Sequence, residues 1–514
     1  MARTLTLQGT RTIACIGFMG AGKSTAAAAI ARLTGRREID VDRVVEQRLG
    51  KSIEQVFAQD GEPAFRAAEE TVTLELLDDP SAPVLALGGG AIESPAVRDA
   101  LAEHLVLWID VDLDTAWRRV RGGGRPLARE REEFDHRYAR REPIYAALAD
   151  VVVPSQSMGS METVLSSVEG MPSGTRVIWA ATASGSYPVY IGADLLEGHR
   201  FWPASVSGRR FLVTDGNAGR HYGHTLDPLD GRVVIMPGEQ SKTIAHAEIV
   251  WTELVRAGMT REDVVVALGG GVIGDLAGFC AATYQRGVRY VQVPTTLVAQ
   301  VDSAYGGKTG VDLPEAKNYV GAYHQPSAVL ADSQTLASLP AAELAAGYAE
   351  VVKTALIAGG DLWDRIRAGA DPAAPGVIAA CALTKLRIVA QDERDGGLRQ
   401  VLNLGHTVGH AIETSTGYAR YRHGEAVALG LLATLRLSGQ DALRDEVLGL
   451  LSARGLPTRL EDADPDAVVM ATARDKKRTG EGPVPFVLLD GPGQARPGRA
   501  VAARDLIAAV RELA

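Results

Sequence analysis

Residues 17–25 read GFMGAGKST, directly after the apolar run TIACI. The stretch fits the pattern GxxxxGK[ST] at Gly17, Gly22, Lys23 and Ser24. An alanine-rich segment follows, so the loop joins an expected buried strand to an expected helix. Its glycines let backbone N–H groups wrap a polyphosphate, and the helix N-terminus favours negative charge. The pattern therefore predicts a nucleoside triphosphate site, with Lys23 on the β and γ phosphates and Ser24 on Mg²⁺.

Short apolar runs alternate with amphipathic segments beyond this loop, which predicts βαβ units and a parallel sheet with helices on both faces. A second βα pattern starts at RVIWAAT and continues through FLVTDGN, VVIMPGE, VVVALGGG and YVQVPTT. From about residue 335 the strands stop and helical periodicity takes over. We expect an α/β chain with a P-loop domain, a linker region rich in Ser, Gly and Met, a Rossmann-like α/β lobe and an all-helical lobe, spanning residues 1–170, 155–175, 175–333 and 334–514 respectively.

The composition describes an ordinary globular chain that is too long for a single core. It has 514 residues, 46% of them hydrophobic and 23% charged. A net charge of −9 gives no basic field for holding nucleic acid. The three cysteines form no CxxC, no apolar run approaches the ~20 residues of a membrane span, and no signal-like segment precedes the first loop. We expect a cytoplasmic protein with neither membrane nor nucleic-acid partners.

Two aspartates, Asp40 and Asp42, follow a short strand. If the backbone there is extended, both side chains point the same way. One could support Mg²⁺ through water, and the other could accept a hydrogen bond from a substrate hydroxyl. Further on lie Arg66 in FRAAEE, the turn GGG at 88–90, the glycine- and arginine-rich RGGGRPLARE, which suits a mobile lid, and Arg141 in RREPIY.

With these motifs in register, residues 10–170 closely resemble shikimate kinase. The resemblance implies that Asp40 supports Mg²⁺ through water, that Asp42 orients or deprotonates the attacking hydroxyl, and that arginines take the carboxylate through bidentate geometry. Lys23, Asp42 and Arg125 would be catalytic. The implied ATP contacts are Gly20, Ala21, Gly22, Lys23, Ser24, Thr25 and Arg125, and the implied shikimate contacts are Asp42, Arg66, Gly88, Gly89, Gly90 and Arg141.

A second glycine-rich junction, GGGVIGDLAGF at 269–279, follows the strand VVVAL. It suits a dinucleotide pyrophosphate, although it is not GxGxxG and is weak by itself. Acidic groups at two earlier strand ends could take ribose hydroxyls. The polar stretch at 292–318 sets several lysines near glycine-rich backbone, which suggests a bound phosphate. A solvated lysine loop is the alternative for each lysine.

The run GHTVGH at 405–410 places two histidines four apart, on one face of a helix. Thr407 stands where the HExxH pattern has its glutamate. Glu350 and Lys353 lie three apart on an expected helix, and His423 lies downstream. A carboxylate with two imidazoles suits a catalytic Zn²⁺ with an open position. Histidines satisfied within the core are the alternative from spacing alone.

From about residue 175 to 514 the chain strongly resembles 3-dehydroquinate synthase, through the block from GGGVIGDLAGF to AVLAD and through LNLGHTVGHAIE and HGEAVALG. The resemblance implies NAD and a Zn²⁺ or Co²⁺ ion bound by Glu350, His406 and His423. The implied NAD contacts are Asp215, Asn217, Glu239, Lys242, Gly270, Gly271, Asp275, Thr295, Thr296, Lys308 and Lys317. The implied contacts to the heptulosonate phosphate are Arg286, Asp302, Lys308, Asn318, Lys353, Lys385, Arg399, Asn403, His410 and Lys476 or Lys477, with Lys353, Lys385, Arg399 and His410 counted as catalytic.

The implied reaction converts 3-deoxy-D-arabino-heptulosonate 7-phosphate into 3-dehydroquinate and phosphate. NAD⁺ takes hydride from the C5 carbinol, phosphate is eliminated, the hydride returns, and ring opening and aldol closure follow. Another sugar-phosphate cyclase, a polyol dehydrogenase, or a chain with one inactive domain are the alternatives. Asp395 stands where the family often has a glutamate, so its shorter reach leaves the role of that position open. The resemblance also suggests a homodimer formed through the synthase.

Overall fold

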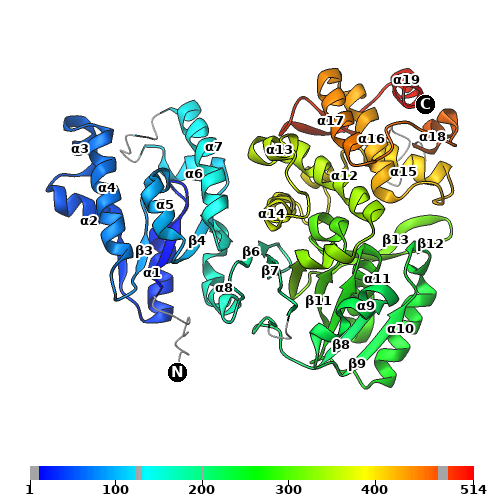
Figure 1. The fold of residues 1–514 in the computed structure, drawn as a ribbon, viewed down its shortest axis with the longest axis horizontal. Coiled ribbons are helices and arrows are strands. Elements are labelled where there is room, and N and C mark those ends of the chain that lie inside the picture. Colours follow the sequence, from blue (N-terminus) through cyan, green and yellow to red (C-terminus); the bar gives the residue numbers. More distant parts are fainter. Residues whose placement is uncertain (1–10, 123–126, 128–129, 198–200, 473–483) are drawn as a thin grey trace. The chain divides into compact units, whose positions relative to one another are not determined.

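The computed structural model describes residues 11–122, 127, 130–197, 201–472 and 484–514. The chain divides into two compact units. The first is assigned residues 1–181, 188–190 and 201–206, and the second is assigned 182–187, 191–200 and 207–514. Figure 1 draws both units, and each is described by itself below.

The first unit is built on a parallel sheet whose strands run in the order β2-β3-β1-β4-β5-β6. The apolar runs of the sequence form these strands and are almost fully buried. Their carboxyl ends therefore meet at one edge of the sheet, where the glycine-rich loops begin. The strands are β1 (Ile13–Ile16), β2 (Glu38–Asp40), β3 (Val84–Ala86), β4 (Leu105–Asp110), β5 (Val151–Pro154) and β6 (Arg176–Ala181).

Helices cover this sheet, as the βαβ pattern predicts (Figure 1). They are α1 (Lys23–Thr34), α2 (Val41–Leu49), α3 (Ile53–Gln59), α4 (Glu62–Leu77), α5 (Pro95–Leu101), α6 (Leu113–Val120), α7 (Arg131–Leu148) and α8 (Met161–Val168), with 3₁₀ turns η1 (Ala91–Glu93) and η2 (Ser155–Ser160). Helix α8 falls within the region expected as linker, yet Val164 and Leu165 are fully buried. Residues 169–175 are what remains between α8 and β6.

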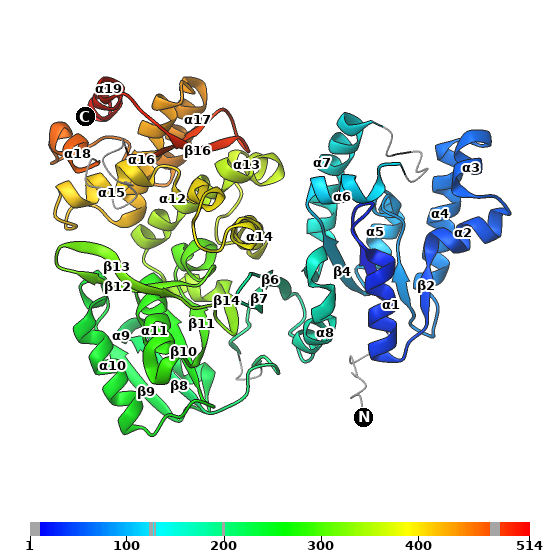
Figure 2. The ribbon, with the colours of Figure 1, turned by 180° about the vertical axis from the view of Figure 1, so that it is seen from behind.

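The second unit starts with an α/β lobe whose parallel strands follow the order β14-β11-β10-β8-β9. Its core packs the sheet against α10 and α11 (Figure 2). The strands are β8 (Arg210–Asp215), β9 (Gly231–Ile235), β10 (Val264–Gly269), β11 (Arg289–Pro294) and β14 (Ala328–Asp332), and the helices are α9 (Gly216–Tyr222), α10 (Ile244–Arg256) and α11 (Gly271–Thr283), with short turns η4 (Gly223–Leu226), η5 (Glu239–Ser241), η6 (Tyr284–Arg286) and the π-helical η7 (Ala299–Ser303). The residues of β7 (Ser186–Gly192) are divided between the two units, with 188–190 assigned to the first.

The polar stretch after β11 contains a hairpin that its sequence did not reveal. Strands β12 (Lys308–Leu313) and β13 (Ala316–Tyr323) pair antiparallel, with a register shift after Val311. In Figures 1 and 2 the hairpin lies between α10 and α15. It therefore carries its lysines toward the junction of the two lobes.

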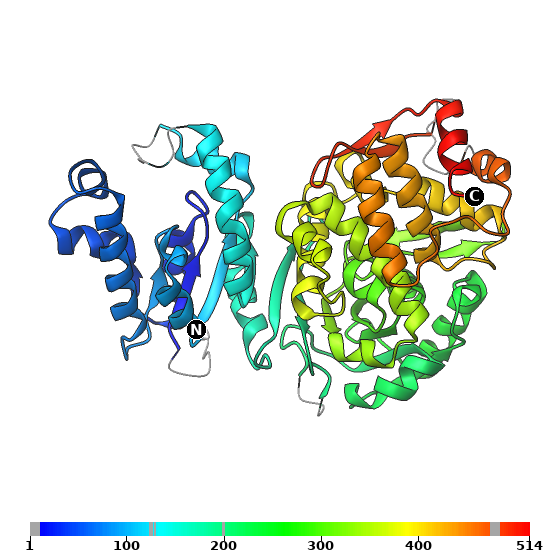
Figure 3. The same ribbon diagram turned by 45° about the horizontal axis from the view of Figure 1, so that its top comes forward.

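The C-terminal lobe is helical, as predicted, and gathers on one side of the α/β lobe (Figure 3). The expectation that strands stop near residue 335 is wrong in one place, because β15 (Phe486–Leu489) and β16 (Ala495–Arg499) form an antiparallel pair. No helix within the described residues is long and apolar enough to cross a membrane. The helices are α12 (Ala341–Ala358), α13 (Gly360–Arg367), α14 (Pro375–Gln391), α15 (His406–Ser415), α16 (His423–Leu437), α17 (Asp441–Ala453), α18 (Pro465–Thr472) and α19 (Ala503–Arg511), with 3₁₀ turns η8 (Ser333–Ser338) and η9 (Leu398–Asn403).

Candidate active sites

The first glycine-rich loop runs from the end of β1 to the start of α1, as predicted. Gly17 has φ 145° and Gly20 has φ 80°, and a Cβ on Gly17 would lie 2.6 Å from the carbonyl oxygen of Ile109. Glycine is therefore required where the loop crosses β4. The Lys23 ammonium donates to the carbonyl of Phe18 across the loop, at 3.3 Å. Gly20, Ala21, Gly22, Ser24 and Thr25 complete the loop and the first turn of α1.

The two aspartates after β2 do not share the extended backbone that would align them. The strand ends at Asp40, and Asp42 already lies in the first turn of α2. The Ser24 hydroxyl donates to Asp40 at 2.7 Å, which places that carboxylate beside the expected Mg²⁺ position. A Cβ on Gly88 would lie 2.8 Å from Asp42 Oδ1, so this carboxylate sits at the GGG turn instead. Because α2 starts between them, the Asp40 carboxylate lies beside Ser24 and the Asp42 carboxylate lies at the GGG turn.

A cavity of about 630 Å³ opens beside the GGG turn. Arg66 on α4 donates to Glu69 at 2.5 Å and pairs with Glu62 at 3.0 Å. A Cβ on Gly90 would collide with the Arg66 guanidinium, so the turn approaches this arginine as closely as glycine allows. The cavity is lined by Glu62, Pro63, Arg66, Ala67, Glu69, Glu70, Gly90, Ala91, Glu93 and Ser94.

Arg141 on α7 pairs with Glu93, which lines this cavity. Its guanidinium is 1% exposed and donates to Glu93 at 2.5 Å. Its Nε is buried and has no hydrogen-bond partner. Tyr145, one turn further along α7, donates to the carbonyl of Gly89 at 2.5 Å and fixes the middle of the GGG turn.

The carboxylates that hold these arginines have displaced pKa values. Burial raises the pKa of Glu69 above its ordinary value despite its bonds with Arg66. Glu93 is also partly desolvated, but hydrogen bonds and charge from Arg141 and Arg140 outweigh burial and lower its pKa. Sequence reasoning missed Glu69 and Glu93 as arginine partners. The sequence could have indicated only the Glu69 contact, because Glu69 lies three residues after Arg66 on one helix face.

The second unit forms its glycine-rich junction between β10 and α11. A Cβ on Gly270 would lie 2.9 Å from the Thr296 side chain, and one on Gly271 would lie 3.0 Å from Ser303 Oγ. Asp215, at the end of β8, lies with one carboxylate oxygen 3.2 Å from the Cβ position of Gly269 and accepts bonds from the backbone of Asn217 and Ala218 with the other. Thr295 donates its backbone N–H to the carbonyl of Gly269 at 2.9 Å. Adjacent strand ends thus present a cradle suited to a dinucleotide.

Charged residues extend this cradle toward the hairpin. Lys242 is 4% exposed and donates to Asp275 on α11 at 2.5 Å. Burial alone would lower the pKa of Lys242, but Asp275 and Glu239 together raise it. Lys317 on β13 lies 3.5 Å from Glu239 and 3.4 Å from Glu413 of α15. The hairpin lysine therefore bridges the two lobes.

Asp302 accepts hydrogen bonds from two lysines that lie on different helices. Lys353 of α12 donates to one of its oxygens at 2.7 Å, and Lys385 of α14 donates to the other oxygen and to the Asp302 carbonyl. Both lysines are buried. Although burial acts against it, this positive charge holds the pKa of Asp302 well below its ordinary value. The same π-helical turn carries Ser303, which faces Gly271.

Arg399 lies on η9, is 2% exposed and donates to the backbone carbonyls of Glu393 and Gly306. Asn403 ends the same turn and precedes α15. Lys308, at the start of the hairpin, pairs with Asp395 at 2.5 Å. The shorter aspartate thus reaches the lysine, which gives the departure from the usual glutamate a defined partner.

Three side chains from three helices converge on one point. Nε2 of His406 and Nε2 of His423 each lie 3.4 Å from Oε1 of Glu350. The Nδ1–H of His406 donates to the carbonyl of Leu404 at 3.2 Å, which leaves Nε2 as an acceptor. Glu350 is 1% exposed; its Oε2 pairs with the Lys353 ammonium at 2.5 Å, and its Oε1 faces both imidazoles. A buried carboxylate oxygen and two imidazole nitrogens that face one point fit a divalent cation.

A second triad, His410, Glu413 and His423, could also hold an ion by distance. The hydrogen bonds favour the first triad. Glu413 accepts from Nδ1–H of His423 at 3.2 Å and from Lys317 at 3.4 Å, so it is already satisfied. This bond leaves Nε2 of His423 facing Glu350, as a carboxylate–histidine–metal arrangement requires. Although burial opposes it, hydrogen bonds to Glu350 and Glu413 and the charge of both carboxylates raise the pKa of His423 to about 10, so the pocket favours positive charge.

His410 shares the helical face of His406, with ring centroids 5.3 Å apart. It lies outside the triad that includes Glu350, as its proposed substrate role requires. Glu413, which sequence reasoning missed, continues the same face three residues after His410. That i,i+3 spacing was the available signal.

Among the remaining predicted contacts, Arg286 is the residue that lies away from the others. Arg286 is exposed and follows the C-terminal end of α11, whereas the glycine cradle is at the N-terminal end, roughly 20 Å away along the helix. The structure does not bring Arg286 to the lysine and histidine cluster. Asn318 is exposed on β13, where its backbone donates to Asp312. Arg125, Lys476 and Lys477 lie outside the described residues.

Comparison with known proteins divides the chain in the same way. Residues 19–171 match the shikimate kinase family model, 232–346 match 3-dehydroquinate synthase N-terminal, and 347–478 match 3-dehydroquinate synthase C-terminal. A 3-dehydroquinate synthase of Acidithiobacillus ferrooxidans (strain ATCC 53993 / BNL-5-31) is 44% identical over 330 residues, covering 60% of this chain and 90% of the relative. The chain belongs to the 3-dehydroquinate synthase family. Its synthase part follows a shikimate kinase domain on the same chain.

Solved structures similar to the synthase include other cyclases. A 2-deoxy-scyllo-inosose synthase complexed with carbaglucose-6-phosphate, NAD⁺ and Co²⁺ has a TM-score of 0.59 and 25% identity, covering 66% of this chain and 100% of that one. ValA, a 2-epi-5-epi-valiolone synthase from Streptomyces hygroscopicus subsp. jinggangensis 5008 with NAD⁺ and Zn²⁺ bound, has a TM-score of 0.59 and 28% identity, covering 65% of this chain and 98% of that one. The synthase thus shares its fold with cyclases of lower identity than its 3-dehydroquinate synthase relatives.

Proposed function

We propose that this chain catalyses two reactions of the shikimate pathway at separate sites. One phosphorylates shikimate with ATP, and the other converts 3-deoxy-D-arabino-heptulosonate 7-phosphate to 3-dehydroquinate and phosphate. The observation that carries the synthase assignment is the convergence of Glu350, His406 and His423 in a unit that also holds a glycine-rich dinucleotide cradle. The kinase assignment rests on the P-loop and on a cavity lined by Arg66 and by Glu93, the partner of Arg141.

In the kinase site, Lys23 and the loop N–H groups would hold the ATP phosphates, and Ser24 with Asp40 would hold Mg²⁺. Asp42, at the GGG turn, would accept the proton of the attacking hydroxyl. Arg66 and Arg141 would take the shikimate carboxylate through their fork geometry. Positioning and charge neutralisation then carry the transfer.

In the synthase site, Glu350, His406 and His423 would hold Zn²⁺ or Co²⁺, and the cradle at Gly270 and Gly271 would hold NAD. The bound cation supplies Lewis acidity toward a carbinol, and NAD supplies a reversible hydride acceptor. The protein's cations neutralise the substrate's phosphate and carboxylate, and His410 holds or moves a proton near the phosphate. These cations are Lys308, Lys353, Lys385 and Arg399.

The heptulosonate substrate is favoured over those of other cyclases by two observations. The 3-dehydroquinate synthase relative is 44% identical, against 25–28% for the inosose and valiolone synthases. Arg399 and the Asp302 lysine pair also provide for a carboxylate as well as a phosphate. Phosphate release together with chromatographic identification of 3-dehydroquinate tests this assignment. Release of phosphate with a different carbocycle would overturn it.

The two sites can be separated by single substitutions in the full chain. Lys23→Met should abolish ATP-dependent phosphorylation of shikimate and leave phosphate release from the heptulosonate intact. His406→Ala should have the reverse effect. Loss of both activities in either variant, with unchanged thermal unfolding, would contradict two independent sites.

The proposal also includes domain boundaries at 170, 175 and 334, a cytoplasmic location, and a homodimer formed through the synthase. The order of the described strands ends at β9, where Val234 and Met236 are 56% and 71% exposed. An apolar edge strand is suited to pairing with a second copy. Light scattering of the parent and of Val234→Lys tests the dimer, since a charge on the edge should shift it toward monomer.

Cleavage at a protease site inserted within residues 169–175 should spare both activities.

A further inference from the structure

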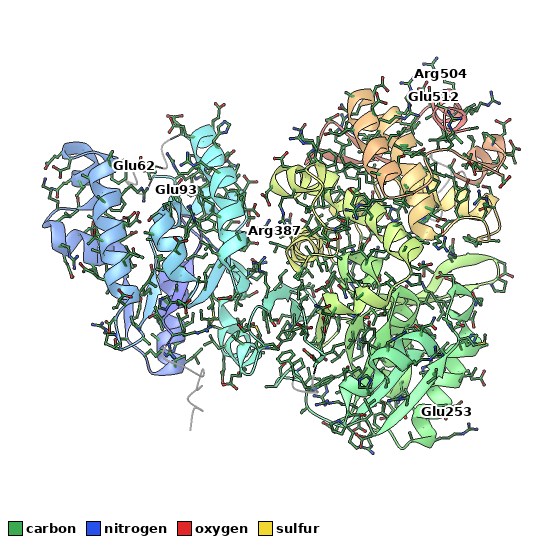
Figure 4. The ribbon with its side chains drawn as sticks, in the orientation of Figure 1. Glu62, Glu93, Glu253, Arg387, Arg504 and Glu512 are labelled. Carbon is green, nitrogen blue, oxygen red and sulfur yellow. The ribbon has the colours of Figure 1, made fainter. Side chains whose placement is uncertain are left out.

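The shikimate cavity has an unexpected charge for a site that takes an anion. Four glutamates line it, Glu62, Glu69, Glu70 and Glu93, with Arg66 as the cation among the lining residues. Glu62 and Glu93 are labelled in Figure 4. Arg141 is not part of the lining, although its partner Glu93 is. The cavity wall in front of Arg141 is therefore a carboxylate.

Glu93 occupies two arginines at once. Its Oε2 accepts from Arg141 at 2.5 Å, and its Oε1 accepts from Nη2 and Nε of Arg140 at 2.7 and 3.1 Å. Arg140 is solvent-exposed at 66% of its side chain, whereas Arg141 is 1% exposed. Because Arg141 has almost no exposed surface, a carboxylate that enters from the cavity can reach its guanidinium only if Glu93 moves aside. Charge-assisted bonds of this kind are the strong ones in proteins.

Arg141 is also incompletely satisfied by Glu93. Its Nε is buried without a hydrogen-bond partner, so Glu93 engages only the Nη2 end of the fork. A ligand carboxylate can instead approach a guanidinium through two parallel N–H donors. Glu93 stands on the short 3₁₀ turn η1 and is 27% exposed, so its side chain can swing outward and stay with Arg140.

We propose that Glu93 is an internal competitor for Arg141, which the carboxylate of the substrate displaces during binding. This inference rests on the proposed shikimate kinase function and adds a residue that sets its substrate affinity. Glu93 is a positioning residue, because it acts through Arg141 and leaves the site when substrate enters. Apparent affinity is reduced by the fraction of molecules in which Glu93 holds the arginine.

The isosteric variant Glu93→Gln tests this competition in the full chain. It keeps the side-chain shape and removes the charge, so we expect the KM for shikimate to fall by roughly tenfold with kcat and the KM for ATP unchanged. Equilibrium binding of shikimate, measured by calorimetry without ATP, should tighten by the same factor. Glu75→Gln is the matched control, because Glu75 pairs with Arg48 at 2.6 Å on the exposed surface of the same unit.

Other outcomes overturn the inference. An unchanged or higher KM for shikimate would mean that Glu93 holds Arg141 in position for substrate and does not compete with it. Glu93→Ala separates charge from packing, and its KM should also fall; a rise in both variants refutes displacement. Synthase activity and thermal unfolding of each variant report on folding. Absence of shikimate phosphorylation in the parent chain would instead refute the kinase function, independently of Glu93.

Discussion

Glu413 gives the sharpest test of the metal centre, because it touches a proposed ligand without being one. It is 3% exposed and accepts the Nδ1–H of His423 at 3.2 Å. The pKa of Glu413 falls to about 2, because the bond and charge of His423 and the charge of Lys317 outweigh burial. Its carboxylate therefore stays ionised near neutral pH, and it orients the imidazole so that Nε2 faces Glu350.

The size of the effect follows from that bond. A hydrogen bond to a charged group contributes about 1.5–3 kcal/mol, and about 1.4 kcal/mol is a factor of ten in affinity. Glu413→Gln keeps an acceptor and loses the charge, so we expect roughly tenfold weaker Zn²⁺ binding. Glu413→Ala loses both, so we expect roughly a hundredfold, within the range measured for such outer partners.

Zn²⁺ affinity would be measured by competition with a chromophoric chelator, on metal-stripped full-length protein at fixed pH. Thermal unfolding of the same sample reports on folding of the synthase unit, and Glu446→Gln, a half-exposed carboxylate on α17, is the control. If both Glu413 variants bind Zn²⁺ as tightly as the parent, the bond to His423 does not support the metal and the reasoning is wrong. Tighter binding would point to the second triad as a competing site.

Three further outcomes are expected. Gly90→Ala should raise the KM for shikimate by roughly tenfold or more and leave the KM for ATP unchanged, because its Cβ collides with the Arg66 guanidinium; steady-state kinetics with each substrate varied would show it. Although burial opposes it, hydrogen bonds from Arg209 and Thr260 lower the pKa of Asp263 to about 2. The ionised Asp263 therefore stabilises the fold fully above the ordinary aspartate pKa, and this stabilisation is lost as the pH falls toward 2. Asp263→Asn should therefore lower the unfolding temperature at pH 7 more than at pH 2.5, in thermal scans. Dialysis against a strong chelator should abolish synthase activity, which added Zn²⁺ or Co²⁺ restores, whereas kinase activity should need only Mg²⁺; synthase activity that survives verified metal removal would contradict the metal triad.

Local patterns predicted most of the elements, because strands and glycine loops are written in neighbouring residues. TIACI and VVVALGGG are buried strands ending in glycine junctions, as expected. The hairpin β12–β13 was missed because glycines and charged residues interrupt its apolar residues, so it lacks the alternation that marks a strand. β15 was missed for a different reason, since FVLL is too short to distinguish from a helix by period.

The sites were predictable where one helix carries the residues, and less so where distant segments meet. His406 and His410 share a face by spacing alone, but that spacing could not show that Glu350 completes the triad. Nor could it show that Arg141 is held by Glu93, which lies 48 residues earlier in the chain. Asp42 was expected to align with Asp40 only if the backbone were extended, and the helix that starts at Val41 removes that condition. Tertiary pairing decides these contacts.

Each site meets the same electrostatic constraint. A cation that binds a substrate anion must be desolvated, and an unpaired buried charge is costly, so the chain must supply a carboxylate before the substrate arrives. Arg141 has Glu93, and the buried lysine pair has Asp302. The pairings differ in whether the carboxylate can move away from the cation that it holds. Asp302 is held between two buried ammonium groups, so we expect substrate to bind beside it, whereas Glu93 can move outward with an exposed arginine. The carboxylate that pairs with the cation therefore stays in place in the synthase site, whereas substrate displaces it in the kinase site.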